Sequence, residues 1–182
     1  MSINQLAGNV TMNSALSPEQ ARLYQDPATI RQALAETKTV AIVGLSPNTQ
    51  RASHFVGSYL NYEGYRIVPV NPRADEIFGF KAYPDLLSID QEETGPIDMV
   101  NVFRRPEECL EIARQAVEIG AKVLWLQLRV ISEEAAQIAA DGGLTVVMDR
   151  CVKIEHGRYS GSLHWVGMNT EIITARKARR WF

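Results

Sequence analysis

The sequence predicts an α/β fold of the Rossmann-like, doubly wound type, with a mostly parallel sheet of five to six strands and helices on both faces. Short β-branched or apolar runs recur along the chain, as expected of strands that are buried on both faces of a parallel sheet. Amphipathic stretches separate most of these runs, with short connections. The 182 residues are 46% hydrophobic and 22% charged, which suits one globular domain.

Two helices are expected before the first strand, after a leader at residues 1–16 that shows no clear period. The first helix begins at Ser17, because serine caps helices well and Pro18 suits the first helical position. The second helix begins at Asp26 for the same reasons and continues toward Glu36. Both precede the sheet in the chain, so we expect them to pack on one edge or face of it.

The first two strands are expected to flank a single helix. Residues 39–45 (TVAIVGL) form the first run and residues 65–70 (YRIVPV) the second. The second run stops before Pro72, because proline cannot donate to a strand ladder. Between the runs, residues 53–63 place apolar side chains on one helical face, and Gly64 ends that helix.

Residues 74–96 form the least regular part of the chain. Only a short helical turn near residues 85–87 and an acidic loop at residues 90–93 are expected there. Regular alternation then resumes, with strands and helices in the order strand 97–103, helix from Arg105 to Gly120, strand 122–128, helix 132–140 and strand 144–148. A terminal helix is expected from about residue 170.

The composition excludes several classes of protein. The 19 basic and 21 acidic residues leave a net charge of -2, whereas a protein that binds nucleic acid over its whole surface is strongly basic. No apolar run approaches the roughly 18 residues of a membrane span, and the expected start of a signal peptide is missing. Two cysteines are too few for a disulfide framework or a zinc site made of cysteines alone. Reduced thiols in a cytoplasmic protein are therefore expected.

The turn after the first strand is the first candidate for ligand binding. In open α/β sheets the ligand lies beyond the carboxyl ends of the strands, near the point where the strand order reverses. Gly44 lets a ligand approach the backbone, and the next helix offers free N–H groups and its positive dipole end. His54 lies in the first turn of that helix and is a candidate contact. A phosphate would suit this turn, although an ordinary strand–helix turn also favours Gly44 and Ser46.

A nicotinamide cofactor suits the same segment less well. The turn has the pattern G-x-S and not G-x-G-x-x-G, and no acidic residue follows the second strand to hold a ribose hydroxyl. Arg73 instead favours an extra phosphate, as on NADP or on the 3′-phospho-ADP of coenzyme A (CoA). No GK[ST] sequence is present, which excludes a Walker A loop.

The ends of the later strands carry further candidates. Arg104 and Arg105 could contact phosphates or stack on a ring, with one over the cleft and one in solvent, or they could pair with neighbouring glutamates. Trp125 is expected in the core, and Gln127 is expected to face the cleft. Cys151 is either an accessible thiol at the crevice or an inert buried one. Metal-ligand spacings and the G-x-S-x-G elbow are absent from the sequence.

Residues 39–156 resemble the stand-alone CoA-binding protein family, single Rossmann-like domains similar to the CoA-binding part of the succinyl-CoA synthetase α subunit. The matching stretches, in order, are VAIVGLSPN, RASHFVGSYL, GYRIVPVNPR, VNVFRRPEE, AKVLWLQL and VVMDRCVKIEH. The resemblance implies that CoA, or a related adenine nucleotide, lies across the strand ends. It implies phosphate contacts at Gly44, Leu45, Ser46, Ser53 and His54, a nucleotide border at Val70, Asn71 and Pro72, and an adenine or phosphate side at Phe103, Arg104 and Arg105. Arg51 stands where lysine is commoner in the family, which keeps the positive charge.

The resemblance implies binding of CoA or an acyl-CoA more strongly than catalysis, because the phosphohistidine and partner subunit of the synthetase lie outside this domain. A non-catalytic binding, carrier or regulatory module is therefore expected. The alternatives are an NADP-type oxidoreductase, or an interaction protein with a vestigial cleft. The expected division is an N-terminal leader with helices (1–38), a CoA-binding domain (39–156) and a C-terminal extension (157–182).

Four basic side chains near the C-terminus suggest a further contact. They follow the expected terminal helix and precede two aromatic residues: Arg176, Lys177, Arg179 and Arg180. Cations at a helix end complement its dipole, so a solvated end explains them. The functional alternatives are contact with the protein's own body, a homodimer in which this segment docks on a second copy, and a small RNA contact, of which RNA is the weakest.

Overall fold

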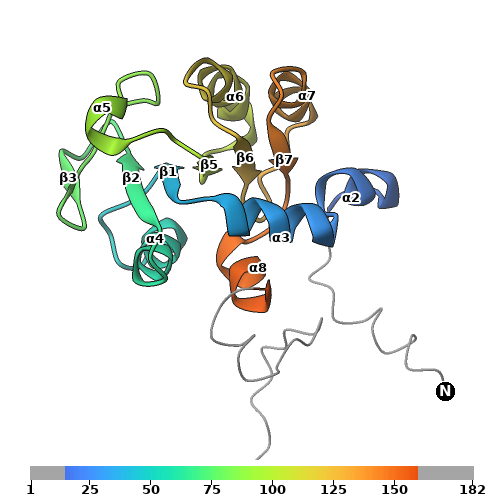
Figure 1. Cartoon of the computed structure of the whole chain (residues 1–182), viewed down its shortest axis with the longest axis horizontal. Coiled ribbons are helices and arrows are strands. Elements are labelled where there is room, and N and C mark those ends of the chain that lie inside the picture. Colours follow the sequence, from blue (N-terminus) through green and yellow to red (C-terminus); the bar gives the residue numbers. More distant parts are fainter. Residues whose placement is uncertain (1–14, 160–182) are drawn as a thin grey trace, which may run out of the picture.

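A computed structural model describes residues 15–159 of the chain and confirms the expected fold class (Figure 1). One parallel sheet contains five strands in the order β2-β1-β5-β6-β7. The strands are β1 (Thr39–Val43), β2 (Arg66–Val70), β5 (Met99–Val102), β6 (Val123–Leu126) and β7 (Thr145–Val147). The chain runs outward from β1 to β2 and then returns across β1 to β5, so the strand order reverses between β1 and β5.

The strands are buried on both faces, as their continuous apolar runs predict. Every residue of β1, β5 and β6 is buried, and the first residue of β2 and of β7 is exposed. The observed strands are shorter than the apolar runs, because some buried apolar residues lie in the turns that follow the strands. Leu45, for example, is fully buried although β1 ends at Val43.

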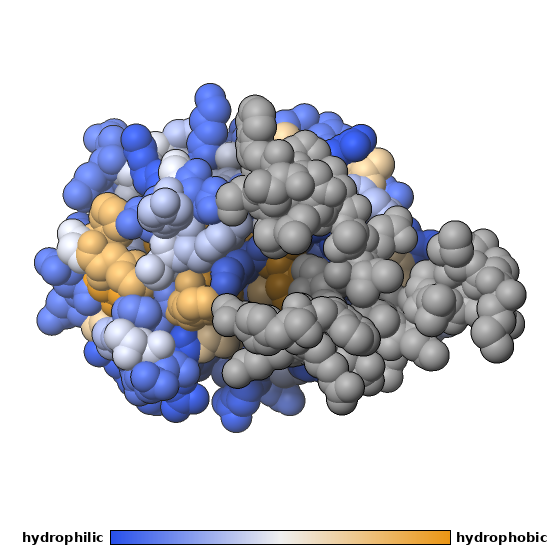
Figure 2. All heavy atoms as spheres, turned by 90° about the horizontal axis from the view of Figure 1, so that it is seen from below, coloured by the Kyte–Doolittle hydropathy of each residue, from blue (hydrophilic) through white to orange (hydrophobic). Residues whose placement is uncertain are grey.

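Helices cover the two faces of the sheet (Figure 1). One apolar cluster joins a sheet face to α6 (Cys109–Glu118) and α7 (Glu133–Asp141). The other cluster joins the opposite face to α3 (Pro27–Glu36), α4 (Ala52–Tyr62) and α8 (Val152–Tyr159). On the side shown in Figure 2, apolar surface appears only as separate patches among hydrophilic residues. The described part of the chain thus places most of its apolar side chains inside.

The two N-terminal helices begin where their capping residues predict. Ser17 accepts a hydrogen bond from the Gln20 N–H and forms a capping box at the start of α2 (Pro18–Tyr24). Asp26 accepts from the Thr29 N–H at the start of α3. The expectation that these helices pack on the sheet is confirmed, because α3 buries its apolar side on one face and the Tyr24 carbonyl accepts from the N–H of Met148, next to β7.

The segment 74–96 is more regular than its sequence indicates, and two expectations for it are wrong. A small hairpin forms from β3 (Glu76–Ile77) and β4 (Phe80–Lys81). The acidic stretch is a short helix, α5 (Gln91–Thr94), because the Asp90 carboxylate accepts from the first N–H groups of that turn. No helix forms at residues 85–87, where the chain makes bends and a turn instead.

Helix α8 is a correction as well, because the sequence predicts no helix between residue 151 and the terminal helix expected from about residue 170. Its sequence (VKIEHGRY) has a weak apolar period, since its buried face includes the charged Glu155 and the polar His156.

A 3-10 turn (Pro106–Glu108) precedes α6. Among residues 15–159, no helix is long and apolar enough to cross a membrane. The expected terminal helix and basic C-terminal residues lie outside the described residues, and the division at residues 38 and 156 stays a prediction.

Candidate functional site

The carboxyl ends of β1, β2 and β5 meet at one place, where the strand order reverses. The N–H of Gly44 donates to the Val70 carbonyl at 2.9 Å, and the N–H of Phe103 donates to the Val43 carbonyl at 2.8 Å. These bonds join the turn after β1 to the last residue of β2 and to the first residue after β5. The structure therefore brings together three of the segments that the sequence singles out for binding.

Gly44 has a positive φ of 86°, a backbone conformation that residues other than glycine rarely adopt. A Cβ at this position would lie 2.9 Å from the Cδ of Arg104 and 3.3 Å from the carbonyl oxygen of Phe103. Both the backbone conformation and the space therefore require glycine. The absence of a side chain makes room for the Arg104 stem, and Gly44 itself is half-buried.

The turn after Gly44 is fastened to the first turn of α4. The Ser46 N–H donates to the Ser53 hydroxyl at 3.1 Å, and the Nδ1 atom of His54 lies 3.0 Å from the Ser46 carbonyl oxygen. Because a carbonyl oxygen only accepts hydrogen bonds, this contact requires a proton on Nδ1 of His54. Ser53 is buried and so holds the turn in place, whereas Ser46 and His54 are half-buried.

The start of α4 lacks a capping side chain. Helices α2, α3 and α7 begin with a serine or aspartate that accepts from the first turn, whereas α4 begins after Arg51, which makes no such bond. No acidic residue lies in the first turn of α4. The positive end of this helix is therefore not neutralised by a side chain, which favours an anion beside it.

Asn71 ties the turn after β2 to the turn after β1. Its Nδ2 donates to the Leu45 carbonyl at 2.7 Å, and its Oδ1 accepts from the Arg73 N–H at 2.9 Å. Pro72 and Arg73 are exposed. The side chain of Leu45 is fully buried, and that of Val70 is buried beneath the cavity described next.

A cavity of about 310 Å³ opens beside Gly44, on the side of the sheet covered by α6. Its wall is largely apolar, with charged and amide side chains from the start of α6. The lining residues are Val43, Gly44, Val70, Pro72, Pro84, Asp85, Leu86, Arg104, Glu108, Glu111, Ile112 and Gln115. Sequence reasoning found the strand-end residues of this wall and missed those from α6 and the turn before α5. The spacing of Glu108, Ile112 and Gln115, on one helical face, was the signal for the α6 side.

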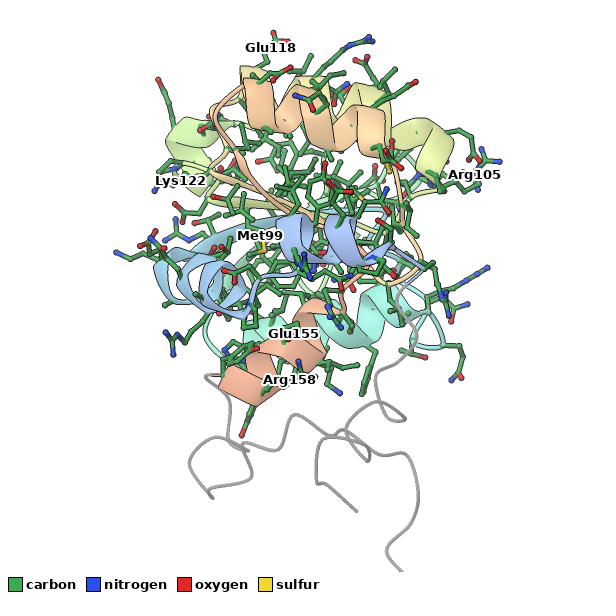
Figure 3. All side chains as sticks on the ribbon, turned by 90° about the vertical axis from the view of Figure 1, so that its right-hand side faces the viewer. Met99, Arg105, Glu118, Lys122, Glu155 and Arg158 are labelled. Carbon is green, nitrogen blue, oxygen red and sulfur yellow. The ribbon has the colours of Figure 1, made fainter. Side chains whose placement is uncertain are left out.

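Arg104 and Arg105 share one carboxylate. The Nε of Arg104 donates to the Glu108 Oε2 at 2.7 Å, and the Nε of Arg105 donates to the Glu108 Oε1 at 3.0 Å. Burial alone would raise the pKa of Glu108, but the two guanidinium groups hold that pKa below its ordinary value. Arg104 lines the cavity, whereas Arg105 is 79% exposed and reaches away from the ribbon in Figure 3. The pairing with a neighbouring glutamate is thus observed and one member lines the cavity, while contact with a phosphate or a ring stays a prediction.

The remaining candidates lie apart from this cavity. Gln127 does not face the cleft as expected, because it is buried and donates to the Oδ1 of Asn101 at 2.8 Å. Trp125 is fully buried, as expected of a core residue. Cys151 is a half-buried free thiol. Within residues 15–159, no group of three or more His, Cys, Asp or Glu side chains is placed to hold a metal ion.

Comparison with known protein families identifies the domain. A family model for the CoA binding domain matches residues 38–157. The chain belongs to this CoA-binding domain family. The resemblance in the six sequence stretches is thereby confirmed, and the match covers the strand ends, the cavity and α4.

Individual relatives place the chain beside small stand-alone proteins. YneT of Bacillus subtilis, an uncharacterized protein, is 44% identical over 129 residues, which are 71% of this chain and 93% of YneT. A hypothetical protein from Pyrococcus horikoshii OT3 has a similar structure, with a TM-score of 0.69, 37% identity and coverage of 74% of this chain and 92% of that one. Each of these relatives thus consists almost entirely of the matched domain.

A larger enzyme shares the domain. Acetate–CoA ligase [ADP-forming] I of Archaeoglobus fulgidus is 26% identical over 121 residues, which are 63% of this chain and 18% of the ligase. The chain therefore matches under a fifth of that ligase.

Proposed function

We propose that the chain binds coenzyme A or an acyl-CoA at the carboxyl end of the sheet, as a non-catalytic binding, carrier or regulatory module. Membership in the CoA-binding domain family supports a ligand of this class. The observation that carries the proposal is the Gly44 turn, whose glycine has a positive φ and lies between the uncapped start of α4 and a cavity of about 310 Å³.

The two sides of the Gly44 turn suit different parts of this ligand. On one side lie the start of α4, Arg51 and the half-buried His54, which favour phosphates. On the other side the cavity wall is largely apolar, and the Glu108 carboxylate in it is already paired with Arg104 and Arg105. We therefore place the diphosphate at Ser46 and the start of α4, and the adenine ring in the cavity. Arg73 is exposed beside Asn71 and is available to a further phosphate.

Two other expectations belong to this proposal. Cys109 and Cys151 are both free thiols, which is in keeping with the reducing cytoplasm that we propose as the site of action. A homodimer through the basic C-terminal segment rests on the sequence alone, since that segment lies outside the described residues. Measuring the mass in solution before and after removal of residues 176–182 tests the dimer.

A ligand panel tests the proposed function. We expect CoA and acetyl-CoA to raise the melting temperature, while NAD and NADP leave it unchanged. A ligand at 100 times its dissociation constant stabilises a fold by about 2.7 kcal/mol. For a chain of this size that corresponds to a rise of roughly 5–10 °C. A rise with NADP and none with CoA would support the oxidoreductase alternative, and no rise with any of the four would favour a vestigial cleft.

A further inference from the structure

Arg104 crosses the binding site in a fixed position. Its Cδ lies 2.9 Å from where a Gly44 Cβ would be, so the aliphatic stem runs over the open glycine. Both Arg104 and Glu108 line the cavity, and the two side chains are 41% and 29% exposed. A half-exposed arginine has many rotamers, and the contact with Glu108 selects one of them.

The geometry of this contact leaves part of the guanidinium available. Arg104 uses Nε and Nη2 to donate to the same oxygen of Glu108. A guanidinium carries five N–H groups, so the edge formed by Nη1 and the rest of Nη2 still has donors. That edge has the fork geometry that binds the oxygens of a phosphate in pairs. A carboxylate on one edge and a phosphate on the other can therefore share one arginine.

We propose that Glu108 is a positioning residue for the ligand, which acts by holding Arg104 so that its unused edge faces an anionic group of the bound CoA. This inference rests on the proposed function. Glu108 also accepts from Arg105, so its negative charge is shared by two guanidinium groups. Because Asp85 and Glu111 add negative charge to the same wall, an anion is attracted there by the unused donors of Arg104 and not by the net charge.

A positioning role and a purely electrostatic role predict opposite results for Glu108→Gln. This substitution keeps the shape of the side chain and removes its negative charge. If Glu108 acts only through its charge, CoA binds more tightly to the variant. If Glu108 positions Arg104, CoA binds about tenfold more weakly, because a charge-assisted bond that fixes the guanidinium is lost.

Glu107→Gln is the matched control. Glu107 carries the same charge, lies next to Glu108 in the 3-10 turn and is exposed. Its removal changes the long-range charge by the same amount without touching the contact with Arg104. We expect a change in CoA affinity of about twofold or less, toward tighter binding.

The deciding experiment is a double-mutant cycle, with CoA affinity measured by calorimetry at one ionic strength and melting temperatures measured alongside. Arg104→Ala and Glu108→Gln are compared singly and together. We expect Glu108→Gln to have no effect in the Arg104→Ala background, because Glu108 acts through that side chain. Equal or tighter binding by Glu108→Gln alone, or a full additional loss in the double variant, would overturn the inference and leave the proposed function intact. If the unmodified protein fails to bind CoA, both the inference and the proposed function are overturned.

Discussion

At the amino end of the sheet, the Asp98 carboxylate accepts from the N–H groups of Lys38 and Thr39 and from the Lys122 ammonium, at 2.8–3.0 Å. At the carboxyl end, the start of α4 lacks a capping side chain, Arg73 is exposed and Arg104 keeps unused donors. Figure 3 separates the two ends, with Lys122 on one side of the molecule and Arg105 on the other. The polar groups at the amino end bind one another, whereas the carboxyl end keeps these donors available to a ligand in addition to the hydrogen bonds that fasten its turns. We therefore expect substitutions at the amino end to change stability and those at the carboxyl end to change binding.

The largest expected effect is on binding, from Gly44→Val. A side chain at residue 44 collides with Arg104 and Phe103 and requires a disfavoured backbone conformation, so we expect CoA affinity to fall by at least about a hundredfold, a free-energy change of about 2.7 kcal/mol. Calorimetric titration of the folded variant measures the loss.

Gly120→Val is the matched control for the strain. Gly120 has a φ of 72°, and no heavy atom lies within 4 Å of the Cβ that it would gain. Both variants therefore force a valine into a backbone conformation with positive φ, but only Gly44→Val brings the new side chain against neighbouring atoms at the proposed site. If both lose CoA affinity equally, backbone strain and not the Gly44 turn explains the loss.

The second effect is on stability, from Asp98→Ala. Asp98 is 7% exposed, and its removal leaves two backbone N–H groups without their acceptor. We expect the free energy of unfolding to fall by about 2–3 kcal/mol while CoA affinity stays the same. Urea unfolding and calorimetry check the two parts, and a large loss of affinity in the folded variant would contradict the separation of the two ends.

The contribution of Asp98 to the stability of the fold is also expected to depend on pH. Burial alone would raise the pKa of Asp98, but bonds from Lys122, Thr39 and Lys38 hold that pKa below its ordinary value. A carboxyl with a lowered pKa stabilises the fold above its unfolded pKa, and this contribution is lost as the pH falls through the folded pKa. The Asp98→Ala variant should therefore lose less stability on acidification below about pH 4 than the unmodified protein.

The third effect concerns His156, which is buried on α8 beside α4. Burial lowers the pKa of His156, while Glu63 raises it by a smaller amount. The Tyr59 hydroxyl lies 2.9 Å from its Nδ1, and burial raises the pKa values of Tyr59 and Tyr65 to about 12, so neither tyrosine titrates near neutrality.

A histidine with a lowered folded pKa stabilises the fold fully above its unfolded pKa of about 6.5. That contribution falls as the pH drops from there toward the folded pKa. We expect the melting temperature to decline over this window, and to decline less in His156→Gln. An identical decline in both proteins would show that His156 is not the group responsible.

The smallest effect is expected from Arg105→Ala. Arg105 is 79% exposed and lies outside the cavity wall, so its loss should weaken CoA by about twofold or less. Arg104→Ala removes the side chain that lines the cavity and should weaken CoA by tenfold or more, as loss of a charge-assisted contact does. Titration of both variants at one ionic strength compares them. Equal losses would mean that the exposed arginine contacts the ligand as well.

The sequence predicts those parts of the molecule in which local pattern and tertiary burial agree. The strands follow from continuous apolar runs, and the N-terminal helices follow from Ser17 and Asp26. Gly44 is also predictable, because a glycine directly after a buried strand signals a close backbone approach.

The parts that the sequence misses depend on polar contacts between distant segments. The apolar period of helix α8 is weak because its buried face carries Glu155 and His156, and the Nδ1 of His156 lies 2.9 Å from the Tyr59 hydroxyl of α4. The sequence predicts that Gln127 faces the cleft, because it does not show that the Asn101 side chain on the neighbouring strand accepts a hydrogen bond from the Gln127 amide. Glu108 pairs with arginines three and four residues before it, as the sequence allows, but its place in the cavity wall beside Gly44 depends on the fold.

The central claim is that the ligand binds at the carboxyl end of the sheet, and backbone amide chemical shifts during a CoA titration test it most directly. We predict that the shifts concentrate at residues 44–54, 70–73 and 103–105, while the amides of Lys38, Thr39 and Lys122 stay unchanged. Shifts concentrated around Asp98 and Lys122, or none at saturating CoA, would contradict the account.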